Sequence, residues 1–277
     1  MLTSIVGKYF WEEGTVMYSV VIPVFNGEDY IVETLNSILN QSVLPRSVAV
    51  VDDCSTDGTV ELLTEYRKTV PPDVTFNIGC TPQGSGSAAA PRNIGIEYPL
   101  GEYVAFCDAD DIWHQQKAEK QLELLSAGEC DAVFTSVEKF FDKWGGERAE
   151  LPEQVIRTLS VSDFRFDNPV KSCSSIMLRS DLLKLVTFPL GVEYRGVEDY
   201  YCWVGLYASK NDLRFLKLEL PLVGYRQHPA SVSSSKLAMS ALRMRTYHYK
   251  KSMLKKAGMR MPNKYLAEIR YLMKQVL

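Results

Sequence analysis

Three aspartates follow an apolar run in the stretch AFCDADDIWHQQK, residues 105–117. Carboxylates this close together repel one another and are costly to desolvate, so they must be solvated, used as caps or neutralised by a cation. With a bend after the strand, Asp108 and Asp110 can address one hard cation, Mn²⁺ or Mg²⁺, which completes its shell with water and phosphate oxygens. Asp111 is then free to cap a helix expected from about residue 114. From this stretch alone, caps or solvated charges explain the acids equally well.

A second acidic pair, Asp52 and Asp53, ends the apolar part of VVDDCSTDGT, residues 50–59. The Ser, Thr and Asp that follow are typical helix N-caps. Capping does not require the two acids as well. Because a carboxylate at the end of a strand can accept a hydrogen bond from a base imide or a ribose hydroxyl, a nucleotide contact is the functional alternative.

The stretch TPQGSGSAAAPRNIGIE, residues 81–97, is rich in small residues and opens a helix. Its backbone could approach a phosphate, with Arg92 as a planar donor to the oxyanions. It matches neither the G-x-G-x-x-G nor the P-loop pattern, and glycine-rich turns are common. Phosphate contact therefore remains a hypothesis at this point.

Two later stretches carry further polar candidates. RGVEDYYCWVGLYA, residues 195–208, places Glu198 and Asp199 in the first turn of a helix, where acids often serve only as partners of the helix dipole. A carboxylate beside a bound metal diphosphate could instead act as a general base. YRQHPASVS, residues 225–233, adds Arg226 and His228, and a lone histidine is more often structural than a ligand.

The elements that must position these residues alternate between apolar runs and amphipathic segments. Strands are expected at 18–25, 47–52, 74–79, 102–107 and 131–136, and helices at 27–41, 57–66, 88–97 and 114–126. This alternation predicts an α/β fold with a doubly wound, mostly parallel sheet. Ligands in such sheets bind beyond the carboxyl ends of the strands, where Asp52, Asp53, Asp108 and Asp110 are expected.

The regular alternation of expected strands and helices ends in the second half of the chain. Residues 137–170 are expected to be irregular, a shorter set of elements follows at 174–180, 198–208 and 220–226, and a helical tail begins near 236. We expect one domain over residues 1–235, with a nucleotide-binding half at about 18–112 and an acceptor half at about 113–235. The tail, residues 236–277, is expected to be a separate helical extension.

Charge is distributed unevenly between these parts. The tail holds 11 Lys and Arg against one acid, Glu268, while the whole chain has a net charge of −3. A protein without a basic body is not expected to bind nucleic acid. The basic tail suggests docking on an anionic membrane surface, packing on the acidic body or homodimer formation. A solvated helical face that binds nothing explains the same charges equally well.

Several signals bear on the compartment. The six cysteines lack metal-type spacing and suggest reduced, buried thiols. The N-terminus carries Glu12 and Glu13 and does not resemble a signal peptide, and no apolar run approaches the length of a membrane span. A cytoplasmic location, with a peripheral position on the inner membrane face as one option, is expected.

Taken in order, the motifs resemble those of the family 2 inverting glycosyltransferases, which have the nucleotide-diphospho-sugar transferase (GT-A) fold. The resemblance covers about residues 18–235 and rests on SVVIPVFNGEDYIVETLNSILNQ, VVDDCSTDGT, GSAAAPRNIGI, YVAFCDADDIW, GVEDYYCW and YRQHPASVS. Six ordered motifs are far more specific than any one of them.

The resemblance implies a role for each matching residue. Those assigned to the nucleotide sugar are Pro23, Phe25, Asp52, Asp53, Arg92, Asp108, Asp110, Glu198 and Arg226. Asp199 matches the usual catalytic base, and the metal ligands implied are Asp110, Asp108 and His228, for Mn²⁺ or Mg²⁺. Arg92 follows Pro91 where the family has alanine, which leaves its pose open.

The implied activity is metal-dependent transfer, with inversion, from a nucleoside-diphosphate sugar to a hydroxyl of a glycan or lipid-linked acceptor in surface polysaccharide synthesis. Uridine is the base expected from the resemblance. Two alternatives are a non-catalytic nucleotide-sugar binding module and a metal-dependent nucleotidyltransferase. The second would need a basic phosphate-activating motif in the first loop, and PVFNGED has none.

Overall fold

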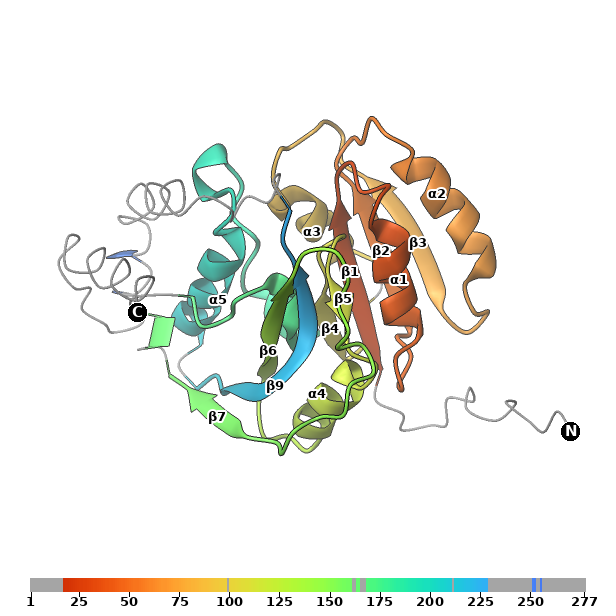
Figure 1. Cartoon of the computed structure of the whole chain (residues 1–277). Coiled ribbons are helices and arrows are strands. Elements are labelled where there is room, and N and C mark those ends of the chain that lie inside the picture. Colours follow the sequence, from red (N-terminus) through yellow and green to blue (C-terminus); the bar gives the residue numbers. More distant parts are fainter. Residues whose placement is uncertain are drawn as a thin grey trace, which may run out of the picture.

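The computed structural model in Figure 1 describes residues 17–98, 100–160, 163–164, 168–210, 212–228, 251–252 and 255. Its strands are β1 (Tyr18–Val24), β2 (Ser47–Asp52), β3 (Thr75–Cys80), β4 (Tyr103–Phe106), β5 (Ile112–Trp113), β6 (Ala132–Phe140), β7 (Ile156–Leu159), β8 (Ile176–Arg179) and β9 (Phe215–Arg226). Its α-helices are α1 (Ile31–Leu39), α2 (Thr59–Tyr66), α3 (Ala89–Gly95), α4 (Lys117–Ser126) and α5 (Glu198–Ser209). Short 3₁₀ helices are η1 (Arg67–Thr69), η3 (Cys173–Ser175), η4 (Ser180–Lys184) and η5 (Val192–Tyr194).

The strands form one twisted sheet in the order β3-β2-β1-β4-β8-β6-β9-β5, and β7 also pairs with β9 (Figure 1). Strands β1 to β4 are mutually parallel, as predicted. Because β8 is antiparallel to both β4 and β6, and β9 is parallel to β6, these last two strands run in the same direction as β4. The carboxyl ends of β1 to β4, β6 and β9 therefore lie along one edge of the sheet.

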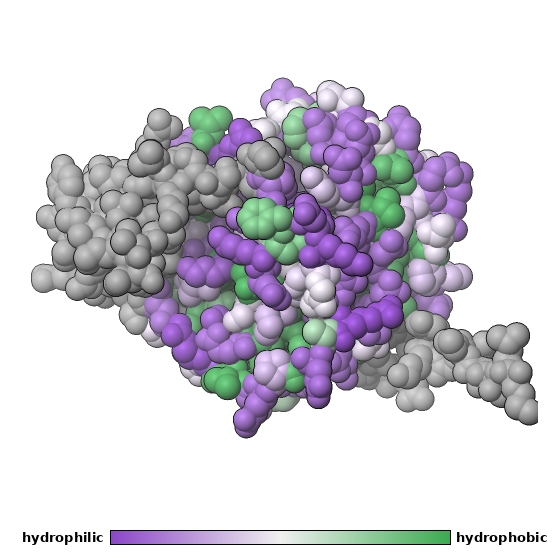
Figure 2. All heavy atoms as spheres, in the orientation of Figure 1, coloured by the Kyte–Doolittle hydropathy of each residue, from purple (hydrophilic) through white to green (hydrophobic). Residues whose placement is uncertain are grey.

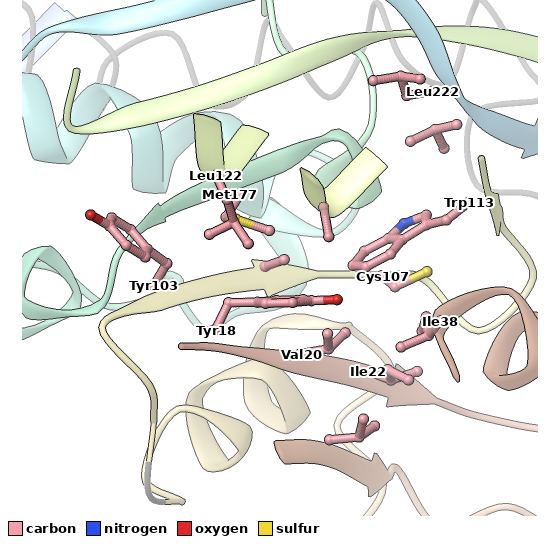
Figure 3. Close-up of a cluster of buried hydrophobic side chains, with 14 of the residues drawn as sticks. Tyr18, Val20, Ile22, Ile38, Tyr103, Cys107, Trp113, Leu122, Met177 and Leu222 are labelled. Carbon is pink, nitrogen blue, oxygen red and sulfur yellow. The ribbon is translucent and has the colours of Figure 1, made fainter. Parts of the chain in front are cut away.

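Both faces of the sheet are covered, which explains why β1 is buried at every position. Val20 and Ile22 point to one face, where they join residues of α1, α2 and α4 in a hydrophobic cluster (Figure 3). Val21 points to the other face, where the cluster includes residues of α3 and α5. The outer surface in Figure 2 is mainly hydrophilic with scattered hydrophobic side chains, as expected for a doubly covered sheet.

Two expectations about the second half were wrong in detail. The sheet continues into residues expected to be irregular, because β6 runs on to Phe140 and β7 adds an antiparallel partner for β9. The helix expected from residue 114 begins at Lys117, since Ile112 and Trp113 instead form β5 against β9. Gly224 of β9 makes room for the Trp144 side chain, because a Cβ at position 224 would lie 2.5 Å from the Trp144 ring.

The predicted boundary between domain and tail falls near residues outside the described part of the chain, so this division stays a prediction. Within the residues that the structure describes, no helix has both the length and the apolar character required to cross a membrane.

Candidate active site

The carboxyl end of β2 presents a carboxylate with a free oxygen. Asp52 is buried, and its Oδ2 accepts a hydrogen bond from the Ser55 backbone N–H at 3.0 Å. Its Oδ1 is also buried, with no hydrogen-bond partner among the described residues. A buried acceptor without a donor is costly, and a ligand N–H or O–H would relieve that cost. Phe25, just beyond β1, leaves 58% of its side chain exposed at the same edge.

Asp53 has a different environment from its neighbour. One oxygen accepts from Thr81 Oγ1 at 2.8 Å, and both accept from the Ser85 N–H at 2.9 and 3.1 Å. Oδ2 also accepts from Ser85 Oγ and from the N–H of Gly86, whose φ of +66° suits glycine. Asp53 therefore orders the glycine-rich loop before α3, and its predicted direct contact with the nucleotide stays a prediction.

Arg92 joins the two acidic motifs into one site. Its guanidinium lies buried between them, with Nη2 donating to Asp108 Oδ1 at 2.6 Å and Nη1 donating to Glu198 Oε1 at 3.0 Å. The sequence suggested a diphosphate clamp, but here two carboxylates occupy the planar fork. Arg92 thus holds the end of β4 against the start of α5, which are far apart in sequence.

The three aspartates after β4 divide into separate roles. The Asp108 N–H donates to Ser174 Oγ at 2.9 Å, while its carboxylate faces Arg92. Asp110 Oδ2 lies 2.9 Å from His228 Nε2. Burial, together with the Asp108 charge, raises the pKa of Asp110 above its ordinary value, and His228 opposes this shift. The crowding inferred from the sequence is therefore present in the fold.

Asp111 was wrongly expected to cap a helix. It is fully buried, and Oδ2 accepts from Ser174 Oγ at 2.5 Å and from Ser172 Oγ at 3.1 Å. Oδ1 accepts from the Arg226 N–H at 3.1 Å. Burial raises the pKa of this carboxyl well above its ordinary range, with the Asp110 charge adding to the effect. Asp111 ties the loop after β4 to η3 and to the end of β9.

Asp199 stands beside this junction at the start of α5. Its Oδ2 accepts from Asn168 Nδ2 at 3.2 Å, and its Oδ1 accepts from the Tyr200 N–H at 2.6 Å. Burial and the neighbouring Glu198 charge raise the pKa of Asp199 to about 7, although the Arg92 cation opposes them. A carboxylate with a pKa near the working pH suits a general base.

Arg226 and His228 hold the far side of the site. The Arg226 Nε donates to the Asp110 carbonyl at 2.9 Å, and its Nη2 is paired with Glu33 of α1. The Tyr30 ring stacks on His228 with centroids 5.6 Å apart, and the Arg226 guanidinium lies 4.9 Å from the Tyr30 centroid. The structure thus brings the two predicted residues to Asp110 and adds a support from α1.

The residues present fit a divalent cation. Among the described residues, no three acidic, histidine or cysteine side chains form a ready-made metal cage. A cation that takes one or two carboxylates and completes its shell with substrate phosphates does not need one. Asp110 and His228 already approach each other at 2.9 Å, and Asp108 is on the same short loop, so this set suits Mn²⁺ or Mg²⁺.

Sequence reasoning missed several supporting residues. Asn168 lies in the region expected to be irregular, Ser172 lies between the expected elements, and Ser174 begins the element expected at 174–180; none was singled out as a site residue. Glu33, which pairs with Arg226, was not singled out from the sequence. Pro23 lies within β1 opposite Val51 of β2, so its predicted nucleotide contact stays a prediction.

A sheet whose carboxyl edge combines an open acidic strand end with a buried acid–arginine–acid junction defines a class, the GT-A nucleotide-diphospho-sugar transferases. Residues 19–186, more than half of the chain, match the model described as Glycosyl transferase family 2. The chain belongs to this family and is a glycosyltransferase.

Individual relatives agree with this assignment. The chain is 31% identical over 221 residues to the putative teichuronic acid biosynthesis glycosyltransferase TuaG of Bacillus subtilis, covering 79% of this chain and 82% of TuaG. It is 24% identical over 220 residues to the Escherichia coli UDP-Glc:alpha-D-GlcNAc-diphosphoundecaprenol beta-1,3-glucosyltransferase WfgD, covering 79% and 81% of the two chains.

A solved structure gives the same fold. Residues 1–349 of TarS from S. aureus in complex with UDP superpose with a TM-score of 0.66 at 22% identity, covering 93% of this chain and 71% of that one. Identity this low supports the fold alone. The alignment with the complete TarS sequence of Staphylococcus aureus covers 72% of this chain but only 34% of TarS.

Proposed function

We propose that this protein transfers a sugar from a UDP-sugar to a hydroxyl of a glycan or lipid-linked glycan acceptor, with inversion and with the help of Mn²⁺ or Mg²⁺. The observation that carries the proposal is the Arg92 bridge, which sets the Asp108 side and the Glu198–Asp199 side against each other. Donor and base can then act on one anomeric carbon.

The nucleotide is assigned to the edge formed by β1 and β2. The uracil ring has one imide N–H, which matches the single unpaired Oδ1 of Asp52. The exposed Phe25 ring offers an apolar surface to the base. Solved TarS structures contain UDP and UDP-GlcNAc, which supports a uridine donor for a related chain.

The diphosphate is assigned to the loop after β4. Asp108, Asp110 and His228 would hold the cation; a mannosyltransferase of the same fold from Pyrobaculum calidifontis has been solved in complex with GDP-Man and Mn²⁺. When bound, such a cation would stabilise the negative charge of the departing diphosphate. Arg226 keeps this loop in place, because its backbone N–H donates to Asp111 Oδ1 and its Nε donates to the Asp110 carbonyl.

Asp199 is assigned as the base that takes the proton from the attacking acceptor hydroxyl. Its Oδ2 bond to Asn168 and Oδ1 bond to Tyr200 orient the carboxylate. A single displacement from the face opposite the leaving group inverts the anomeric carbon, by the same logic as inverting hydrolysis. An α-linked donor would give a β-linked product.

The acceptor is proposed to belong to cell-surface polymer assembly. TuaG is named for teichuronic acid biosynthesis, TarS acts on poly(ribitol-phosphate), and WfgD acts on a diphosphoundecaprenol-linked sugar. These printed activities differ in their acceptors, so they support the class of pathway and leave the acceptor to experiment.

The test is a donor screen. The full-length protein is incubated with a glycan or lipid-linked glycan acceptor and a panel of UDP-, GDP- and dTDP-sugars, with Mn²⁺ or with excess chelator, and released nucleoside diphosphate is measured. We expect release from a UDP-sugar that requires the cation, and a product whose new linkage is β by NMR. A retained anomeric configuration, or equal turnover in chelator, would contradict the proposal.

A matched pair of variants tests the nucleotide assignment. Asp52→Ala should weaken UDP binding, because the imide loses its acceptor, by about tenfold. The control is Asp57→Ala, which removes another acid from the same loop. The Asp57 carboxylate accepts hydrogen bonds from the Glu28 and Thr59 N–H groups, so its loss should leave UDP affinity near the native value. Calorimetry with UDP reads both.

A further inference from the structure

The segment before α5 is anchored to the active site at its first end. The backbone of Phe188 forms two hydrogen bonds with the Asn93 side chain, at 2.9 and 2.8 Å. The Phe188 ring lies 5.4 Å from the Arg92 guanidinium and packs edge-on against Trp203. This anchor fixes the segment to α3 and to the buried arginine.

The second anchor is Glu198 itself. Its Oε2 accepts from the Gly196 N–H at 2.6 Å, and the Val197 N–H donates to the Tyr194 carbonyl at 2.9 Å. The Tyr194 ring packs edge-on against Tyr201 of α5, with centroids 5.5 Å apart. The residues that directly precede Asp199 are therefore fixed by hydrogen bonds of their own.

Between and beside these anchors, large aliphatic side chains face solvent. Leu185, Leu190 and Val192, which we call the apolar tip, are 48%, 62% and 85% exposed. Gly191, with a φ of +120°, turns the chain between the last two. Figure 1 shows the turn projecting beyond the upper end of α5, and Figure 2 shows hydrophobic surface at that upper edge. Neighbouring Leu182, Leu183 and Phe188 are buried, so the segment directs its other apolar side chains inward.

We propose that the apolar tip inserts into the interface of an anionic bilayer that carries the lipid-linked acceptor. The inference rests on the proposed function, because an acceptor hydroxyl must reach Asp199 while its carrier lipid stays in the membrane. The tip lies on the segment that ends at Asp199, so insertion brings the rim of the site to that surface. Exposed aliphatic side chains beside a membrane gain stability by leaving water.

The charges around the tip agree with an anionic surface. Lys184 and Arg195 are exposed on the same segment, with Glu193 as the exposed acid between them. Independently of where they lie, residues 236–277 carry 11 Lys and Arg against one acid by sequence, so the chain has basic groups to offer an anionic lipid. Basic residues attract anionic lipid over a distance that salt shortens, whereas insertion of aliphatic side chains is insensitive to salt. The two contributions can therefore be separated.

The first experiment is co-sedimentation of the full-length protein with vesicles of phosphatidylethanolamine and phosphatidylglycerol. The test variant is Leu190→Asp with Val192→Asp, and the matched control is Val60→Asp with Val155→Asp, which adds the same charges at exposed positions on α2 and before β7. We expect the test variant to bind vesicles about tenfold more weakly at both low and high salt, and the control to bind nearly as the native protein does.

The second experiment compares acceptors. Turnover of a lipid-linked acceptor in vesicles should fall about tenfold in the test variant, while turnover of a water-soluble acceptor sugar should not change, because the tip does not touch the reacting atoms. Equal loss on both acceptors would show that the tip serves the site itself and would overturn the proposal.

Other outcomes also decide the matter. Native protein that does not sediment with vesicles, or a test variant that sediments like native protein, contradicts insertion. A change in oligomeric state of the test variant without vesicles would assign the tip to a protein interface, which also overturns it. Since sedimentation needs no donor, a failure of the donor screen alone would leave this result standing.

Discussion

The predicted nucleotide-binding half, about residues 18–112 and here called the donor half, and the predicted acceptor half, about residues 113–235, contribute different kinds of contact, and this division stays a prediction. In the donor half, Asp52 and Asp53 stand at the end of β2 and bind nearby loops, as Asp53 does with Ser85. Across the junction of the halves, contacts join residues 106, 115 and 118 positions apart, namely Arg92 with Glu198, Asp111 with Arg226 and Asp110 with His228.

The two regions also differ in what they leave unpaired. The edge formed by β1 and β2 keeps a buried Asp52 Oδ1 with no hydrogen-bond partner among the described residues, and an exposed Phe25. At the junction, Arg92 Nη1 and Nη2 and both Asp111 oxygens have partners within the chain, while the buried Arg92 Nε has none among the described residues. The comparison teaches that local contacts shape the β2 edge, whereas long-range contacts join the end of β4 to α5 and β9.

The largest effect should follow from removing the base. Asp199→Asn keeps the shape of the side chain but cannot accept a proton, so kcat should fall by about 10²–10⁴-fold. UDP affinity should not change, because the nucleotide edge lies in the other half. Transfer assays and calorimetry measure the two quantities. Asp181→Asn, an exposed acid paired with Arg179, is the control and should keep native turnover.

A rate for Asp199→Asn within about tenfold of the native rate would mean that another group takes the proton. It would also mean that Asp199, in the acceptor half, takes no direct part in the reaction and only supports the site.

The next effect tests the junction directly. Arg92→Met leaves Glu198 and Asp108 without their shared cation, so the free energy of unfolding should fall by about 3–5 kcal/mol. Adding Glu198→Gln removes one of the stranded charges and should restore part of the loss. Urea unfolding of both single variants and the double variant gives the coupling energy. Additive losses would show that the bridge does not join the halves.

A smaller loss is expected from the neutral part of the same junction. Asp111→Ala leaves two serine hydroxyls and the Arg226 N–H without an acceptor, which should lower the free energy of unfolding by about 2–4 kcal/mol. Asp111→Asn keeps an acceptor oxygen and should lose less. Thermal unfolding measures both, and equal losses would indicate that the charge, rather than the hydrogen bonds, matters.

The smallest effect is a shift in pH dependence. Since burial and Glu198 raise the pKa of Asp199 to about 7, the base is protonated below that pH, and kcat/KM should fall about tenfold for each further pH unit. Glu198→Gln removes a like charge and should move this limb to lower pH. A pH–rate profile checks both, and an unmoved limb would assign it to another group.

The same pKa shift fixes the sign of a stability effect. Asp199 holds its proton more tightly in the folded state than at the unfolded pKa of about 3.9, so its ionisation destabilises the fold as the pH rises towards about 7. Asp199→Asn should therefore be more stable than the native protein at pH 8, and this gain should vanish below pH about 4.

The sequence predicted the donor half well because its information is local. Hydrophobic runs and amphipathic helices are short-range patterns, and Asp52, Asp108 and Asp110 follow directly from them. Their gathering with Glu198, Asp199, Arg226 and His228 was predicted from the family resemblance, which no periodicity could supply.

The details that failed depend on contacts that a linear pattern does not contain. Asp111 looked like a cap because its partners, Ser172, Ser174 and Arg226, come much later in the chain. Strand β5 is two residues long and exists only because β9 lies beside it. The pairing of Arg92 with Glu198 could not be foreseen from spacing, and the predicted contact of Arg92 with the diphosphate stays a prediction.

The long reach of the Arg92 bridge has a consequence for biosynthesis. A nascent chain that has emerged as far as α4 already contains the four mutually parallel strands β1 to β4. N-terminal parts of a chain fold first during translation. Glu198 and Arg226 are not yet present to meet Arg92 and Asp111. The Arg92–Glu198 and Asp111–Arg226 contacts therefore form only after β9 has been made, so assembly of the candidate site waits for the C-terminal part of the described fold.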